Sequence, residues 1–293
     1  MGEIARHPET LSPEKQIPRE RQRKKQHNAL KIFPLSPAQQ RLWLLDQLEP
    51  GNPTYNIPTS WHLHGSLDSA ALERSLHALI QRHEILRATF VLMEGQPVQA
   101  IASEFYLTVP IIDLTALPGE EQRAEAQRQM AFEAEQSFIL AQGPLIRAAL
   151  LRLNTTEHIL LLTIHHSIAD GWSVGVIARE LATLYAAFVA DEAADTSALL
   201  PDLPIQYGDY AVWQRKLLES GAIDDQVEYW KQQLKDAPAL LELPTDYPRP
   251  VAQTYRGASE FILLPPSLAR DLASMSRREG VTLFMILTAV LKM

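Results

Sequence analysis

The chain has 293 residues, of which 46% are hydrophobic and 21% charged, proportions that exclude the disordered and fibrous classes of protein. Its formal net charge of −8 argues against a nucleic-acid partner, because phosphate binding requires a basic face. The chain contains no cysteine, which excludes disulfides, thiolate metal sites and a cysteine nucleophile.

The first residues are predicted to form a linker. Residues 1–31 are polar, carry a basic cluster from Arg19 to Lys25 and show no sustained apolar periodicity. The basic cluster could dock an acidic partner, but a solvated tether is the favoured interpretation. The N-terminus lacks the apolar segment of a signal peptide, and the longest apolar stretches are too short or too interrupted to span a bilayer, so we expect a cytoplasmic protein without a membrane partner.

Two capped helices are predicted next. Ser36 suits an N-cap, with Pro37 at the first helical position and Gln39 completing a capping box, and the helix should extend to about Leu48. Asp68 is a second candidate cap. The helix behind it has an apolar stripe made of Leu72, Leu76, Leu79 and Ile80.

The middle of the chain predicts a strand that leads into a reactive loop. A charged surface helix over 120–135 precedes two strands, over 145–153 and 158–164. The second strand is almost entirely apolar, which suits a central strand covered on both faces. A helix should follow the loop, with apolar positions at Ile177, Leu181, Leu184, Tyr185 and Phe188. A further helical stretch is predicted over 207–234.

Four residues of that loop are candidates for chemistry. Imidazole suits acid–base catalysis because its ordinary pKa of about 6.5 lies near neutrality, so His165 and His166 come first. Asp170 would then orient a ring or hold the loop, and Gly171 would allow close backbone approach. A metal site and a purely structural role in buried hydrogen bonds are the alternatives. A metal site is disfavoured because adjacent side chains of an extended segment point to opposite faces.

Motifs along the chain resemble those of the condensation domains of nonribosomal peptide synthetases. Residues 165–171 read HHSIADG and resemble the HHxxxDG signature of that family. Residues 35–45 (LSPAQQRLWLL) resemble its opening motif, and residues 82–90 (RHEILRATF) its second. Three further segments resemble its FDLxxGPLLR segment, its fourth motif and the connection that follows: 138–147, 207–214 and 243–250. The sequence departs from the family at Ile139, often Asp, and at Ala169, often Ser.

The resemblance implies an α/β fold of the α+β sandwich type. It is a chloramphenicol acetyltransferase-like lobe, in which helices flank a mixed sheet. We expect a linker over 1–31, the N-terminal lobe over 32–250, and a crossover with the start of a truncated C-terminal lobe over 251–293. Condensation domains have two lobes with a tunnel between them, so we expect the second lobe to be largely missing and this chain alone to be inactive.

The resemblance also implies a reaction. The amine of an aminoacyl group on a downstream carrier protein attacks an acyl or peptidyl thioester on an upstream carrier, and an adenylation domain is a neighbour. Phosphopantetheine arms deliver both substrates, and no bound cofactor or metal is expected. His166 is expected to position or deprotonate the amine, and Asp170 to fix the loop through an ion pair. Gly171 would let a backbone N–H approach the carbonyl oxygen, and His165 would be structural.

Other motif residues are assigned by the same resemblance. Trp172 and Ser173 are expected to bind substrate. Bracing roles in the lobe are expected for Arg41, Arg82, Arg87, Tyr207, Asp209 and Trp213. Two alternatives stay open: a noncatalytic remnant that only binds carriers, and a free-standing acyltransferase that uses CoA or a carrier.

Overall fold

The computed structural model describes residues 30–191, 193–196, 199–240, 242–251, 257 and 260–293. The chain divides into two compact units, Met1–Ala239 and Leu240–Met293. The last helix of the first unit ends at Leu234, and the boundary expected at residue 250 stays a prediction. The predicted linker falls outside the described residues, except for residues 30 and 31.

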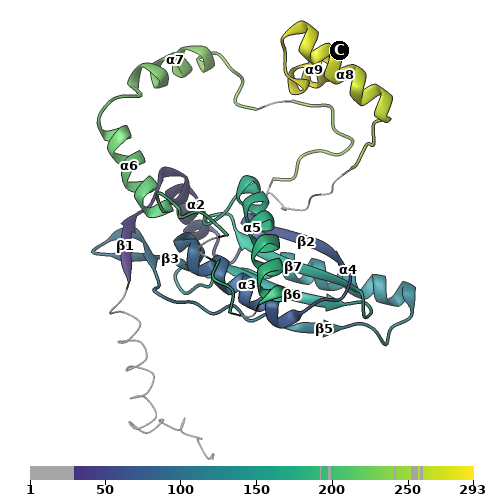
Figure 1. The fold of residues 1–293 in the computed structure, drawn as a ribbon. Coiled ribbons are helices and arrows are strands. Elements are labelled where there is room, and N and C mark those ends of the chain that lie inside the picture. The colour runs from purple at the N-terminus through teal and green to yellow at the C-terminus, as the bar shows by residue number, and fades with distance from the viewer. Residues whose placement is uncertain (1–29, 192, 197–198, 241, 252–256, 258–259) are drawn as a thin grey trace, which may run out of the picture. The chain divides into compact units, whose positions relative to one another are not determined.

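Two sheets organise the first unit (Figure 1). The smaller sheet has the antiparallel order β1 (Lys31–Pro34), β4 (Gln96–Ile101), β3 (Ala88–Met93). The larger has the order β2 (Asn56–His64), β7 (Glu157–His165), β6 (Ile146–Arg152), β5 (Ile111–Asp113). Its pairs are antiparallel apart from β5 and β6, which are parallel. The predicted mixed sheet is therefore confirmed.

The first unit also contains six helices of known bounds among the described residues. They are α2 (Pro37–Leu48), α3 (Ser69–Arg82), α4 (Gly119–Glu135), α5 (Gly171–Ala190), α6 (Tyr207–Glu219) and α7 (Asp224–Leu234). Short 3-10 turns cover Pro53–Tyr55 and Glu84–Arg87. The single helical stretch predicted over 207–234 is divided into α6 and α7. Between them Gly221 has a φ of 74°, in the left-handed region that favours glycine and interrupts a helix.

The two predicted helix caps are confirmed. The Ser36 side chain accepts from the Gln39 backbone N–H at 3.2 Å, and the Gln39 side chain accepts from the Ser36 N–H at 3.0 Å. Asp68 accepts from the Ala71 N–H at 2.9 Å. Each bond satisfies a first-turn donor that the helix itself leaves without a partner.

The main core lies between the larger sheet and helices α3 and α5. It combines Leu72, Leu76, Leu79 and Ile80 of α3 with Ile177, Leu181 and Leu184 of α5 and with Leu160, Leu162 and Ile164 of β7. The opposite face of the sheet packs toward α4 through Ala126, Ala149, Leu151, Ile159 and Leu161. Strand β7 is therefore buried on both faces, as its apolar sequence predicts.

Helix α5 belongs to this core. By length and hydropathy it could cross a membrane. However, its buried residues Ile177, Leu181 and Leu184 pack into the main core, where an apolar helix is expected in a globular fold.

The second unit contains α8 (Pro266–Glu279) and α9 (Leu283–Leu291). Gly280 ends α8 with a φ of 64°, in the left-handed region common at helix C-termini. Thr282 caps α9 by accepting from the Met285 N–H at 3.2 Å. The apolar segment Leu283–Leu291 is thus helical.

Candidate active site

The loop between β7 and α5 is held by backbone hydrogen bonds from both neighbouring strands. The His165 N–H donates to the carbonyl of Leu145 at 2.9 Å, next to β6, and the His166 N–H donates to the carbonyl of Tyr55 at 2.8 Å, next to β2. The Ile168 N–H closes a turn on the His165 carbonyl at 3.0 Å. The backbone of both histidines is therefore attached to the neighbouring strands without the help of a side chain.

The two histidine rings lie on opposite faces of the chain, as predicted. His165 is buried, with 5% of its surface exposed, whereas His166 is exposed. Adjacent residues at the end of a strand point to opposite sides, which accounts for the difference.

His165 is a neutral residue of the interior. Its Nδ1 accepts from the Ser167 backbone N–H at 3.2 Å and lies 2.8 Å from the Ser167 hydroxyl. Since a backbone N–H can only donate, Nδ1 carries no proton. Burial, with a smaller effect from the charge of His166, lowers the pKa of His165 to about 4. This environment agrees with the structural role expected for it.

His166 presents a free nitrogen to solvent. Its Nδ1 lies 3.0 Å from the carbonyl oxygen of Ala169. A carbonyl can only accept, so in the neutral ring Nδ1 bears the proton and Nε2 bears the lone pair. The loop thus selects the tautomer whose exposed nitrogen can accept a proton or a hydrogen bond.

Asp170 caps α5, and the ion pair expected for it stays a prediction. Its exposed carboxylate accepts from the Ser173 N–H at 2.8 Å and from the Ser173 hydroxyl at 2.6 Å. The same hydroxyl accepts from the Asp170 N–H at 3.2 Å, which completes a capping box. The Ser173 side-chain bond is the largest of the effects that lower the pKa of Asp170. Both the backbone and the hydroxyl of Ser173 take part in this cap, and the substrate-binding role expected for it stays a prediction.

Gly171 and Trp172 begin α5 on the open side of the loop. A Cβ at Gly171 would meet nothing within 4 Å, so nothing in the described fold requires glycine there. Its backbone N–H belongs to the first turn of the helix, where donors lack a partner inside the helix. Trp172 is 82% exposed. Both are therefore accessible from solvent.

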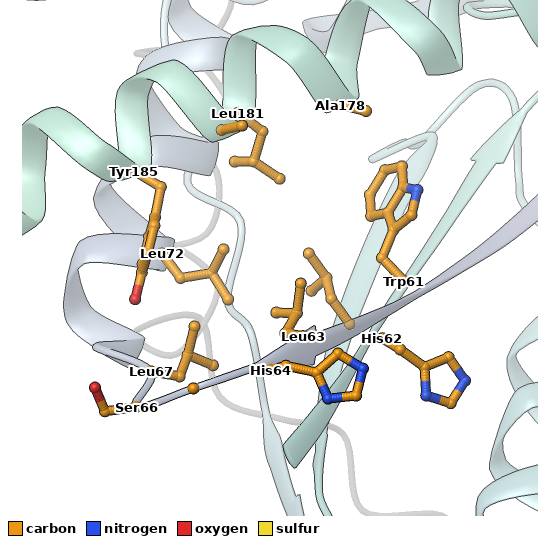
Figure 2. A pocket seen from close by; sticks show the side chains of 13 residues that line it. Trp61, His62, Leu63, His64, Ser66, Leu67, Leu72, Ala178, Leu181 and Tyr185 are labelled. Carbon is orange, nitrogen blue, oxygen red and sulfur yellow. The ribbon is translucent and has the colours of Figure 1, made fainter. Parts of the chain in front are cut away.

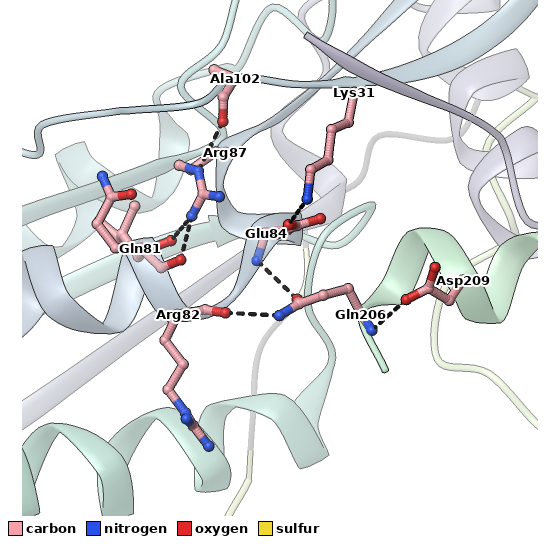
Figure 3. A network of polar contacts seen from close by, with 9 residues as sticks. Lys31, Gln81, Arg82, Glu84, Arg87, Ala102, Gln206 and Asp209 are labelled. Carbon is pink, nitrogen blue, oxygen red and sulfur yellow. Dashed lines mark hydrogen bonds and ion pairs between the residues drawn. The ribbon is translucent and has the colours of Figure 1, made fainter. Parts of the chain in front are cut away.

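Two of the motif arginines brace the unit (Figure 3). Arg87 donates to the carbonyls of Ile80, Gln81 and Ala102 at 2.5, 2.7 and 2.9 Å, and burial lowers its pKa. Arg82 lies 3.3 Å from Glu180 of α5 and donates to the Pro201 carbonyl at 2.5 Å.

The second motif also holds the start of α6, through a residue that sequence reasoning missed. The Gln206 side chain accepts from the Glu84 N–H at 3.1 Å and donates to the Arg82 carbonyl at 3.0 Å (Figure 3). Asp209 accepts from the Gln206 N–H at 2.9 Å, and Lys31 pairs with Glu84. The position of Gln206 just before α6, three residues ahead of Asp209, was the available signal.

The other motif residues divide between bracing and surface positions. The Tyr207 hydroxyl lies 3.0 Å from the Ser36 hydroxyl, and burial is the largest effect that raises its pKa. Arg41 and Trp213 lie at the surface, and the bracing role expected for them stays a prediction. Arg41 is exposed and takes part in none of the hydrogen bonds or ion pairs within the described residues. Trp213 is 56% exposed and contacts Tyr210, with 5.7 Å between ring centroids.

An apolar pocket of about 450 Å³ lies between β2 and α5 (Figure 2). Its lining includes Trp61 and Leu63 of β2 and Leu181 and Tyr185 of α5. In the strand pairing, Asn56 lies opposite His165, whereas His64 lies opposite Glu157 at the other end of β7. The pocket is thus toward the end of β2 that is remote from the histidine loop.

Comparison with known proteins decides the family. The family model described as Condensation domain matches residues 29–293. The chain belongs to the condensation-domain family. The resemblance read from its motifs is therefore confirmed.

Curated relatives of this condensation domain agree. Two of them are different subunits of the linear gramicidin synthase of Brevibacillus parabrevis, which are 49% identical to it over 257 residues and 48% identical over 258 residues. Each match covers 88% of this chain and 5% of the relative. The chain thus spans a small part of the length of these relatives.

Solved structures confirm the fold. The starter condensation domain of rhizomide synthetase RzmA matches with a TM-score of 0.59 and 25% identity, over 71% of this chain and 49% of that one. The X-domain solved in complex with OxyB from teicoplanin biosynthesis matches with a TM-score of 0.69 and 31% identity, over 86% of this chain and 54% of that one. This condensation domain spans about half the length of those solved chains.

Proposed function

We propose that this condensation domain forms an amide bond between two substrates carried by protein partners in a nonribosomal peptide synthetase. The observation that carries the proposal is the exposed Nε2 of His166, left free by the bond from Nδ1 to the Ala169 carbonyl. Family membership and the synthase subunits among its relatives support the same reaction.

The step couples one bond formed to one bond broken. The neutral amine nitrogen of the acceptor attacks the donor's thioester carbonyl carbon, and the carbon–sulfur bond then breaks. Nε2 of His166 orients the amine, accepts its proton as the new bond forms, and returns a proton to the departing thiolate. The products are an amide and a free phosphopantetheine thiol. The N–H of Gly171, at the start of α5, is the proposed donor to the developing oxyanion.

The proposal includes the partners of the domain. An upstream carrier delivers the acyl or peptidyl thioester and a downstream carrier delivers the aminoacyl group, each on a phosphopantetheine arm. An adenylation domain that loads the downstream carrier is the expected neighbour, and the reaction takes place in the cytoplasm. The domain itself holds no cofactor in this scheme.

Replacing His166 with Ala tests the proposal. In the complete protein, we expect His166→Ala to slow single-turnover condensation between two loaded carriers by about 10²-fold to 10⁴-fold. The melting temperature should not change, because the His166 ring is exposed. His64→Ala is the matched control, since His64 is also exposed but lies at the far end of β2. A rate near that of the wild type in His166→Ala would refute the proposed function.

A further inference from the structure

We propose that Gln39 is a positioning residue for condensation, because its side-chain amide holds the loop that carries His166. The inference rests on the proposed function of His166. In the sequence, Gln39 is recognisable as part of the cap of α2 and of the opening motif over residues 35–45. The structure gives the same side chain a second set of contacts, with the reactive loop.

All the polar functions of the Gln39 amide are used. Gln39 is 2% exposed. Its Oε1 accepts from the Ser36 N–H at 3.0 Å, and its Nε2 donates to the Ser167 carbonyl at 3.3 Å and to Oε1 of Gln99 at 3.5 Å. Gln99 is fully buried and donates to the Pro34 carbonyl at 2.9 Å. A buried amide network is costly unless every member is satisfied, and this one is satisfied.

The chemistry of the partners fixes the orientation of the Gln39 amide. The Ser36 N–H can only donate, so it requires the oxygen of Gln39. The Ser167 carbonyl can only accept, so it requires the nitrogen. A flipped amide would place donor against donor and acceptor against acceptor.

The element that holds the loop is itself firmly attached. The Ser36 hydroxyl at the start of α2 contacts the Tyr207 hydroxyl at 3.0 Å. Arg215 of α6 donates to the Leu35 carbonyl at 2.8 Å and to the Gln40 side chain at 3.2 Å. The Ser167 carbonyl is therefore anchored to a helix terminus that two residues of α6 hold in place.

The contact acts on His166 through the turn that contains it. Ser167 follows His166 directly in the chain. The His166 ring donates to the carbonyl of Ala169, which lies two residues after Ser167. Releasing the Ser167 carbonyl lets this turn shift, and with it the direction in which Nε2 points. A displacement of about 1 Å at a reacting group can cost about 100-fold in rate.

Two substitutions at Gln39 test the loop contact, and the first of them preserves the helix cap. Gln39→Glu keeps the capping box, because a carboxylate oxygen accepts the Ser36 N–H, but it sets a second carboxylate oxygen against the Ser167 carbonyl. Gln39→Met fills a similar volume without charge and removes both contacts. Leu114→Ala is the control, since it perturbs the smaller hydrophobic cluster on the α4 side of the sheet.

The experiment measures condensation and the His166 ring in the complete protein. We expect both Gln39 variants to lower the single-turnover rate at saturating carrier by about 10-fold to 100-fold, with little change in the carrier concentration for half-maximal rate. Leu114→Ala should lower the melting temperature and leave this rate unchanged. The ¹⁵N shifts of His166 should show loss of the single Nδ1-protonated tautomer in both Gln39 variants and in no control.

The outcomes distinguish the two proposals. If His166→Ala is inactive while both Gln39 variants condense at the wild-type rate with unchanged His166 shifts, the role of Gln39 is refuted and the proposed function stands. If His166→Ala condenses normally, the proposed function fails, and unchanged ring shifts in the folded Gln39→Met variant would refute the contact's effect on the ring as well.

Discussion

His165 lies beside Ser167 in the interior, and its burial has a consequence for stability in acid. Its folded-state pKa of about 4 is below the ordinary value of about 6.5, so the unfolded chain takes up a proton first as pH falls. The stability due to neutral His165 is fully present above about pH 6.5 and is lost progressively as pH falls toward about 4.

Replacing the titrating group should remove this loss. The side-chain oxygen of Asn in His165→Asn can still accept the Ser167 N–H, but it does not titrate. Between about pH 6.5 and about pH 4, we expect the free energy of unfolding to fall by about 3 kcal/mol less in this variant than in the wild type. Urea unfolding at a series of pH values measures the difference. Parallel curves for the two proteins would show that His165 does not titrate in this way.

Because the cap formed by Asp170 is exposed, we expect its removal to lower the free energy of unfolding only modestly. Asp170→Ala should cost about 1 kcal/mol of unfolding free energy, the usual value for a lost N-cap, rather than the roughly 3 to 5 kcal/mol typical of a broken buried ion pair. Asp170→Ser retains a capping oxygen and is the control. Because the pKa of Asp170 is lowered, the contribution of its charge is present above about pH 3.9 and is lost at more acid pH. A loss near 4 kcal/mol at neutral pH would restore the ion-pair interpretation.

At the scale of elements, the packing of α6 against β1 depends on Gly208. A Cβ at this position would lie 2.6 Å from the ring of Phe33, closer than atoms can pack. We expect Gly208→Ala to destabilise the fold by about 1 to 3 kcal/mol, although alanine alone favours a helix by about 1 kcal/mol. Equilibrium unfolding in urea measures the change.

Gly175 in α5 is the matched control for Gly208. A Cβ added at Gly175 would lie 3.6 Å from the Arg179 side chain, an ordinary packing distance. Gly175→Ala should therefore stabilise the fold by about 0.5 to 1 kcal/mol. Adding Phe33→Leu to Gly208→Ala should recover part of the lost unfolding free energy, because the smaller side chain makes room for the added Cβ. If both glycine variants changed stability equally, the close approach of α6 and β1 would not be the cause.

The sequence predicted those elements whose signals are local. The caps at Ser36 and Asp68 lie within three residues of their partners, and the apolar run of β7 indicates burial on both faces. The capping pair Asp170 and Ser173 is also local, but the sequence analysis expected an ion pair for Asp170 and did not predict this cap.

Contacts between distant parts of the chain could not be predicted in the same way. Gln39 and Ser167 are 128 residues apart, and no periodicity links them. Arg41 and Arg87 look alike in their motifs, yet only Arg87 meets carbonyls that the fold brings together. Whether such a side chain finds a partner depends on its neighbours in the fold, and those neighbours follow from the packing of the whole unit.

At the scale of the molecule, both hydrophobic clusters belong to the first unit. Their buried members all lie between Leu35 and Leu184. We therefore expect a polypeptide ending at Ala239 to unfold with the same free energy as the 293-residue chain, within about 0.5 kcal/mol, the usual range for changes outside a core. Urea unfolding followed by tryptophan fluorescence measures both. A drop of several kcal/mol would mean that Leu240–Met293 contributes to the same core.

The bond from the His166 amide to the Tyr55 carbonyl joins two backbone groups. Point mutations exchange side chains, so they cannot delete either partner unless proline replaces His166. Side chains around the loop can therefore be substituted, in evolution or by design, while the backbone bond between His166 and Tyr55 is kept. The position of the His166 backbone is thus set by the path of the chain, whatever side chains surround the loop.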